Sequence, residues 1–548
     1  MSEHRSVASS AKLIAICTVV SRITGMLRDM LLLQTFGTGW VADAYNFAFQ
    51  IPNLFRRLFG EGSLAAVFVP TFTHALETEG RPSAWKVLAR VLALMSTVIS
   101  ALVILIEILI LILWQTHPGG PERQLAMSLT ALMLPFMLTI CTVALFSSIL
   151  NCLGSFVPAA LTPVVMNLGM MVGILWLGPM FDRQALDRQI YGVAISVIVT
   201  GVIQIALLTP VMRKKGVALG WKLDLNNPHL REIVRRMGPI LFGQGILIIG
   251  TFLDSWICFL FSATKENAKQ GSFLGWTFDY PMDEGALTAL TAAQRLYQFP
   301  LGVLAISIAV AALPAFSRLA THRDWPGWKS EVTKAMRLAL FDGLLAGGMM
   351  IALATPIIQL LFEYRKFDPH ATVRVSGILT LYGLGMWAFC VQHIVLRAFY
   401  SLGDVQTPVK ISCVMVPLNL TISLILIWID PIRVKAFAIS SIITASLSVM
   451  IGFFLLQKRV GTRLLDRELT IAIGKMMLAC VLSAAAAYGI HQLCETYLSD
   501  LIALKALRRA LITGIPLALG TGLFLGLGLL LGLPESKTMM QYVRRRMK

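Results

Sequence analysis

Long apolar blocks alternate with short polar segments along this chain. Each block is close to or above about 20 residues, the length that an α-helix needs to cross the hydrocarbon core of a bilayer. Gly, Pro and charged residues separate the blocks, as in HPGGPER (117–123) and FDPHATVR (367–374). The pattern predicts fourteen membrane-spanning helices, at 11–37, 40–76, 85–115, 124–152, 156–180, 187–212, 232–261, 286–317, 333–362, 372–400, 407–429, 434–457, 469–494 and 506–533.

Composition agrees with a membrane protein. Of the 548 residues, 56% are hydrophobic and 14% are charged, whereas about 25% are charged in an average soluble protein. This excludes an ordinary soluble enzyme and a disordered chain. The net charge of +18 is carried by short segments between the blocks, which favours loops beside anionic lipid over nucleic-acid binding.

The distribution of Lys and Arg also predicts the orientation. Basic residues are more frequent in the termini and in the even-numbered loops, so we expect both termini in the cytoplasm. The loop 211–236 is then cytoplasmic, and the polar loop 262–285 lies outside. The first block contains Arg22 and Arg28 and is too long for a cleaved signal peptide.

A faint internal repeat indicates the domain organisation. LNCLGSFVPAALTPVVMNL (150–168) is similar to FYSLGDVQTPVKISCVMVPLNL (399–420), with a Leu–Gly pair, then Thr–Pro, then Asn–Leu. Repeated halves are common in transporters. We therefore predict an all-α polytopic fold with two six-helix lobes around a central cavity, at 1–212 and 213–460, followed by two C-terminal helices and a basic tail at 461–548.

Several predicted spans carry polar stripes. The second has Asp43, Asn46, Gln50, Asn53, Arg57 and Glu61 on one helical face. The eighth has Thr288, Thr291, Arg295 and Gln298. A lipid-facing stripe of this kind would be expensive, so both stripes should face an aqueous interior. Candidate substrate contacts on the two stripes are therefore Asp43, Asn53, Thr288 and Gln298.

Arginines dominate the charge inside these spans. Arg22, Arg28, Arg56 and Arg295 outnumber the nearby acids, and their surplus positive charge in a poorly solvated cavity favours an anionic ligand. Arg binds phosphate through two parallel hydrogen bonds, so a diphosphate would satisfy several arginines together. The alternative is internal salt bridging or positioning at helix ends, which applies most to Arg57.

Energy coupling and cofactors have weaker signals. The chain has no P-loop, no metal-ligand spacing and no catalytic acid–base constellation, so we expect no cofactor. Asp254 lies mid-span, and Asn419 and Thr444 lie in neighbouring spans of the second lobe. Their oxygens suit a monovalent cation, or Asp254 alone could carry a proton. The alternative for Asp254 is a neutral, hydrogen-bonded carboxyl.

Six stretches together resemble a known family, the lipid II flippases MurJ (also called MviN) of the multidrug, oligosaccharide-lipid and polysaccharide exporter superfamily. The most specific is ADAYNFAFQIPNLFRRLFGEGSLAAVFVP (42–70). The others are SRITGMLRD (21–29), RMGPILFG (236–243), QRLYQFPLGVL (294–304), LFEYRKF (361–367) and FYSLGDVQTPVKI (399–411).

The resemblance implies a bacterial inner-membrane flippase that moves undecaprenyl-diphosphate-linked lipid II from the inner to the outer leaflet. It places the family's cavity arginines at Arg22, Arg28, Arg56 and Arg295, its cavity Asp at Asp43 and its Pro-Asn-Leu asparagine at Asn53. Where many members have two carboxylates around the arginine of the eighth span, this chain has Gln294 and Gln298. Expected partners are lipid II, membrane lipids and other proteins of cell-wall synthesis, without nucleic acid.

Three other functions have distinguishable signatures. An exporter of amphiphilic cationic drugs would be expected to have acidic rather than arginine-rich charge in its cavity. A membrane-embedded polyprenyl-phosphate enzyme would need a convergent acid–base or metal site. A scaffold for wall synthesis would not need the polar stripes.

Overall fold

The computed structural model describes residues 2–58, 64–116, 120–224, 228–263, 270–273, 276–303, 305–461, 464, 466–501 and 504–547. The chain divides into two compact units, Met1–Thr288 and Ala289–Lys548. Each unit is described by itself below.

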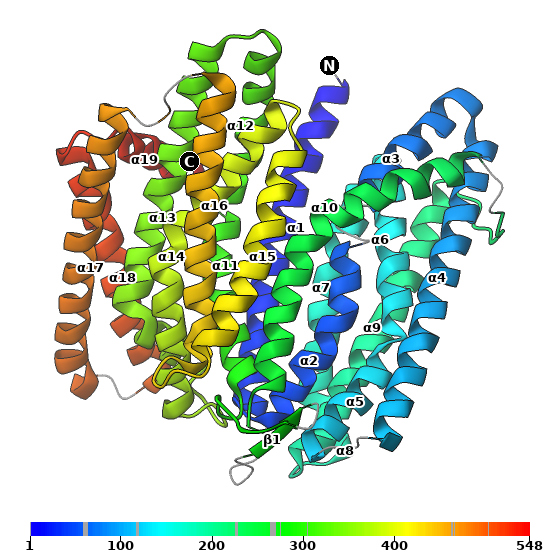
Figure 1. The fold of residues 1–548 in the computed structure, drawn as a ribbon, viewed down its shortest axis with the longest axis horizontal. Coiled ribbons are helices and arrows are strands. Elements are labelled where there is room, and N and C mark those ends of the chain that lie inside the picture. The colour runs from blue at the N-terminus through cyan, green and yellow to red at the C-terminus, as the bar shows by residue number, and fades with distance from the viewer. Residues whose placement is uncertain are drawn as a thin grey trace. The chain divides into compact units, whose positions relative to one another are not determined.

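The first unit consists of helices and one short hairpin (Figure 1). Its helices are α1 (Ser2–Phe36), α2 (Trp40–Phe55), α3 (Leu64–His74), α4 (Arg81–Thr116), α5 (Pro121–Met133), α6 (Phe136–Cys152), α7 (Phe156–Val172), α8 (Gly178–Phe181), α9 (Leu186–Lys214) and α10 (Pro228–Leu260). Short π-helical turns, η2 (Ala75–Glu79) and η3 (Gly173–Leu177), continue α3 and α7. The hairpin pairs β1 (Gln270–Phe273) with β2 (Trp276–Asp279).

The second unit is described as entirely helical. Its elements are α11 (Ala286–Val303), which begins just before the division, α12 (Ala305–Thr321), α13 (Trp325–Leu361), α14 (Pro369–Ser401), α15 (Gln406–Leu426), η4 (Arg433–Lys435), α16 (Ala436–Val460), α17 (Arg467–Leu501), α18 (Lys505–Leu530) and α19 (Pro534–Met547).

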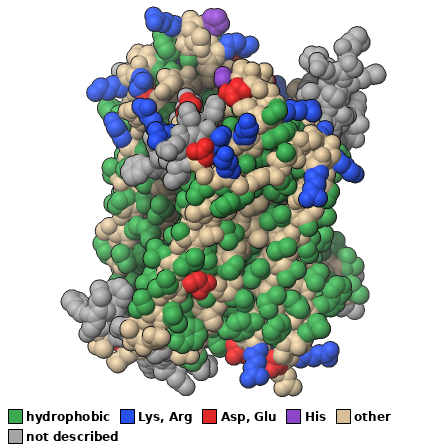
Figure 2. Space-filling model, turned by 90° about the vertical axis from the view of Figure 1, so that its right-hand side faces the viewer, with side chains coloured by type: hydrophobic (Ala, Val, Ile, Leu, Met, Phe, Trp, Pro, Cys, Tyr) green, Lys and Arg blue, Asp and Glu red, His purple; other side chains and the backbone are tan. Residues whose placement is uncertain are grey.

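The helices have the length and composition of membrane spans. Within the described residues, 10 helices qualify, and the bent pair α5–α6 makes 11. Figure 2 shows the matching surface on one face, where hydrophobic side chains form a broad middle band and Lys and Arg gather toward its ends. The prediction of a polytopic, nearly all-helical membrane protein is therefore confirmed, and the count of fourteen spans stays a prediction.

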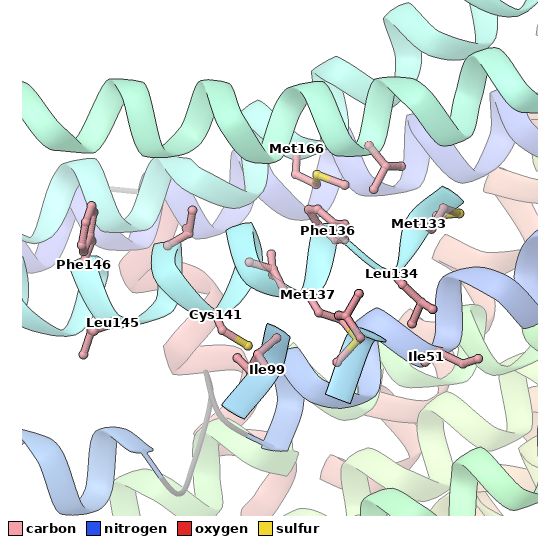
Figure 3. Close-up of a cluster of buried hydrophobic side chains, with 14 of the residues drawn as sticks. Ile51, Ile99, Met133, Leu134, Phe136, Met137, Cys141, Leu145, Phe146 and Met166 are labelled. Atoms are coloured by element: carbon pink, nitrogen blue, oxygen red, sulfur yellow. The ribbon is translucent and has the colours of Figure 1, made fainter. Parts of the chain in front are cut away.

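Within the core of the first unit, α6 packs against α4, α7 and α9. Phe136 and Cys141 on α6 are buried, with Phe136 beside Met166 of α7 and Cys141 beside Ile99 of α4 (Figure 3). Pro135 separates α5 from α6, and the two helices meet at a bend of 41°. Proline removes a backbone donor and cannot continue a straight helix, so the bend follows from the sequence.

The core of the second unit is built on the close packing of α13 against α14. A Cβ at Gly347 would lie 2.4 Å from the carbonyl oxygen of Gly383, so only glycine allows the two backbones to approach this closely. On another side of α13, Phe341 packs against Phe524 of α18, with ring centroids 4.6 Å apart. The two C-terminal helices are thus attached to the second unit through α13.

The hairpin is a correction to the all-α prediction. The sequence analysis described 262–285 only as a polar loop, but within it β1 and β2 pair as antiparallel strands, with Gln270 opposite Asp279. The hairpin is held to the end of α10 by Phe261, whose ring centroid lies 5.4 Å from that of Phe278. Alternation over four residues is too short a pattern to be distinguished from a loop in the sequence.

The repeated segments adopt the same turn. Gly154 and Gly403 have φ values of +70° and +71°, a left-handed conformation that glycine adopts without strain. In both turns the following residue donates its N–H to a carbonyl five residues earlier, Ser155 to Leu150 at 2.7 Å and Asp404 to Phe399 at 3.0 Å. These C-terminal caps end α6 and α14, and α7 and α15 begin directly after them.

Candidate functional site

Arg28 is held by contacts within the first unit. Its guanidinium forms an ion pair with Asp29, at 2.7 Å between Nη2 and Oδ1, and Nη1 donates to Oδ1 of Asn167 on α7 at 2.9 Å. The Arg28 side chain is 11% exposed. Internal pairing, which the sequence analysis considered the weaker alternative here, is therefore what the structure shows for Arg28.

Asn167 was missed as a site residue. Its amide nitrogen donates to the carbonyl oxygen of Ser21 and to Oγ1 of Thr24, both at 3.1 Å. The buried amide of Asn167 therefore fixes α7 against two turns of α1, and its oxygen orients the guanidinium of Arg28. The sequence did contain one signal that could have identified Asn167, namely its place in the repeated Asn–Leu pair at 167–168.

The structure brings Asp43 and Thr288 together. Oδ1 of Asp43 accepts hydrogen bonds from the backbone N–H and the hydroxyl of Thr288, at 2.7 and 2.6 Å. The two residues are 3% and 1% exposed. Asn46, one turn further along α2, donates to the same hydroxyl at 3.0 Å. Because Thr288 lies in the first turn of α11, the carboxylate caps the positive end of that helix.

Further along α2, Asn53 and Arg56 also meet. Nε of Arg56 donates to Oδ1 of Asn53 at 2.9 Å, and both residues are half-buried. Arg57 is exposed, and Glu61 lies outside the described residues. The asparagine thus holds the base of the guanidinium and directs its outer nitrogens.

Arg22 is half-buried on α1, whereas Arg295 and Gln298 are exposed on α11. Arg295 and Gln298 are three residues apart, so they share one helical face in the second unit. Beside them, Gln294 donates to the hydroxyl of Tyr382 at 3.3 Å, and the Tyr382 ring stacks on Tyr297 with centroids 4.4 Å apart. These contacts attach α11 to α14.

Two of the three predicted cation ligands are neighbours. The hydroxyl of Thr444 on α16 lies 3.5 Å from Oδ1 of Asn419 on α15, although its shorter hydrogen bond, at 2.8 Å, is to the carbonyl oxygen of Ser440. Asp254 is 5% exposed on α10 of the first unit. Among the described residues, no group of His, Cys, Asp and Glu side chains could hold a metal ion.

The fold and these polar residues define a polytopic membrane protein with arginines inside its apolar helices. A family model described as lipid II flippase MurJ matches residues 32–507. This match covers most of the chain, which therefore belongs to the lipid II flippase MurJ family. Members of this family are transporters and not enzymes.

Curated relatives agree over most of their length. A probable lipid II flippase MurJ from Rhizobium meliloti is 28% identical and aligns over 86% of this chain and 84% of its own. One from Vibrio cholerae is 27% identical over 93% of this chain and 94% of its own. The lipid II flippase MurJ from Burkholderia cenocepacia is 29% identical over 72% and 73%.

Solved structures share the fold. A lipid II flippase MurJ in an inward closed conformation has a TM-score of 0.69 at 24% identity, over 93% of this chain and 98% of its own. An inward-facing multidrug resistance transporter of the MATE family and MOP superfamily has a TM-score of 0.66 at 14% identity, over 81% and 98%. The helical arrangement is thus common to transporters of different substrates.

Proposed function

We propose that this chain translocates lipid II, the undecaprenyl-diphosphate-linked precursor of peptidoglycan, from the inner to the outer leaflet of the bacterial inner membrane. The observation that carries the proposal is membership of the flippase family, together with arginines placed within apolar helices. A diphosphate is the part of such a lipid that these guanidinium groups would recognise, since each can form two parallel hydrogen bonds to phosphate oxygens.

The proposed substrate contacts are Arg22, Arg28, Arg56, Arg295, Asn53 and Gln298. Asn53 orients Arg56, and Arg28 shares its charge with Asp29. Asp43 and Thr288 act in this proposal by holding the first turn of α11, seven residues before Arg295.

The proposed mechanism is alternating access between lobes at 1–212 and 213–460, with a C-terminal pair at 461–548 and fourteen spans in all. The diphosphate binds from the cytoplasmic side, and the lobes then expose the head group outside. Both termini lie in the cytoplasm, as the distribution of Lys and Arg indicates.

The test is rescue of viability and of lipid II translocation in cells depleted of their own flippase. We expect Ala at Arg22, Arg56 or Arg295 to abolish translocation at normal abundance, and Lys to restore only part of it because it lacks the bidentate fork. Arg28→Ala should also lower abundance, because Oδ1 of Asn167 then loses the hydrogen bond that Arg28 donates to it. Arg188→Ala, which removes a 72% exposed guanidinium on α9, is the control. Normal translocation by all four Ala variants would refute the proposed site.

For energy coupling we propose Asn419 and Thr444 of the second unit as ligands of a monovalent cation, and Asp254 of the first unit as a cation ligand or a proton carrier. Carboxylate, amide and hydroxyl oxygens suit a hard cation. Asp254→Asn should keep lipid binding and change the response of reconstituted flipping to a sodium or proton gradient. An unchanged response to both gradients would remove Asp254 from the coupling mechanism.

The multidrug transporters share the fold, but the identity of 14% supports no common substrate. An exporter of cationic drugs would need acidic charge, and the polar spans here carry more arginines than acids. Lipid II transport therefore explains the charge better.

A further inference from the structure

A pocket of about 320 Å³ opens in the second unit beside the ends of α14, α15 and α16. Lys410, Lys458 and Arg459 line it, together with a single acid, Asp404. Part of its apolar lining is formed by Phe399, which is 1% exposed, and by Leu455. The pocket therefore combines an excess of positive charge with an apolar wall.

The acid in this pocket is already engaged by the protein. Asp404 accepts hydrogen bonds from the N–H and the hydroxyl of Thr407, at 3.0 and 2.7 Å, and forms an ion pair with Arg459. Lys410 and Lys458 are exposed and form no ion pair with the part of the chain that the structure describes. Two lysines are thus left to meet an anion from outside the chain.

The position of the pocket indicates which anion it fits. Lys458 and Arg459 lie in the last turn of α16 and Lys410 lies near the start of α15, so the pocket is at the level where helices leave the hydrocarbon. Phospholipid phosphates lie at this level, and long basic side chains extend toward them from apolar surroundings. A phosphate would meet the lysines while the adjoining glycerol and first methylene groups cover the apolar wall.

The repeat provides an internal comparison. Counted from the two Leu–Gly turns, Lys410 corresponds to Leu161. Leu161 lines a pocket of about 290 Å³ between α7 and α9, with Val157, Gln204 and Leu207 among its other lining residues and no charged side chain. The corresponding surface of the first unit could accept an acyl chain but not a phosphate.

We propose that the pocket at Lys410 and Lys458 is a binding site for an anionic glycerophospholipid, separate from the proposed lipid II contacts. Under the orientation proposed above, the lipid belongs to the cytoplasmic leaflet. The site is argued from the second unit alone and does not depend on the transport activity.

The test measures binding of phosphatidylglycerol to the purified, delipidated full chain by native mass spectrometry, with phosphatidylcholine and inorganic phosphate as separate probes. The variant Lys410→Gln/Lys458→Gln should bind phosphatidylglycerol roughly 30-fold more weakly, if each lysine contributes the usual attraction of a basic side chain to an anionic leaflet. The matched control, Lys214→Gln/Lys215→Gln, removes two exposed lysines at the end of α9 and should bind like the wild type.

Lys410→Arg/Lys458→Arg should retain binding of phosphatidylglycerol. In phosphatidylcholine, all variants should have the melting temperature of the wild type, which would show that they are folded. Equal weakening in both Gln variants would mean unspecific attraction to charge and would overturn the proposal. If inorganic phosphate at an equal concentration displaced phosphatidylglycerol, the site would bind free phosphate, and the proposal of a lipid site would be wrong.

Discussion

Replacing Asp43 separates a role in holding α11 from a direct contact with substrate. Its carboxylate accepts two hydrogen bonds from Thr288, at 2.7 and 2.6 Å, in a place where both residues are almost fully buried. Hydrogen bonds to a charged group contribute about 1.5–3 kcal/mol each. Asp43→Ala removes both and leaves two buried donors unsatisfied, so we expect a loss of about 3–6 kcal/mol.

Asp43→Asn keeps an oxygen acceptor and loses mainly the favourable charge at the start of a helix, which is worth about 0.3–1 kcal/mol. For a unit of this size, about 1 kcal/mol shifts the melting temperature by roughly 2–4 °C. The Ala variant should therefore melt roughly 10 °C or more below the wild type, and the Asn variant only slightly below it. The Asn variant should also keep most of its flipping activity.

The assay is thermal unfolding of the purified protein in detergent, followed by flipping in vesicles. Thr288→Val is a useful companion because it removes the hydroxyl donor and keeps the backbone one, so its melting temperature should fall between those of the two Asp43 variants. If Asp43→Asn melts like the wild type but does not flip lipid, Asp43 contacts the substrate and the positioning role is wrong. Wild-type melting of Asp43→Ala would refute the energetic argument.

Three further outcomes are expected. Arg509→Met should lower the melting temperature well below that of Lys505→Gln on the same helix, because the half-buried Arg509 pairs with Glu363 and lies 5.0 Å above the Tyr364 ring. Equal shifts would contradict this. Burial raises the pKa of the Asp404 carboxyl, but the hydrogen bonds from Thr407 and the Arg459 guanidinium lower it more, to below its usual range. Asp404→Asn should therefore be destabilising at neutral pH, and its melting difference from the wild type should vanish as the pH falls through this lowered value. In a cysteine-free variant on intact cells, an impermeant thiol reagent should label Ser272→Cys and not Gly216→Cys; the reverse would invert the proposed orientation.

The helical framework was readable from the sequence because each span is encoded locally. A block such as 85–115 is apolar over its whole length, and α4 (Arg81–Thr116) contains it. The hairpin at 270–279 was not readable, because its stability depends on contacts such as that between Phe261 and Phe278, which join residues on different elements. Local patterns predict spans well and short paired strands poorly.

The candidate site was predictable in its residue types and only partly in its contacts. Helical spacing placed Asp43, Asn46 and Asn53 on one face, and the structure confirms that Asp43 and Asn46 share a partner on α11. The contact between Arg28 and Asn167 was not predictable, since 139 residues separate them. Such a pair becomes visible only when the packing of α1 against α7 is known.

The two asparagines of the repeat show how the same sequence feature serves different purposes. Asn167 uses its amide oxygen and nitrogen on three partners in α1, at 2.9–3.1 Å. Asn419 meets Thr444 only at 3.5 Å, and that hydroxyl is already bonded to a backbone carbonyl. The first amide is therefore committed to packing and to orienting an arginine of α1, whereas the second takes part in a contact between α15 and α16. Equivalent positions of a repeat can thus keep one side-chain type and use it for different contacts, because the neighbouring helices supply different partners.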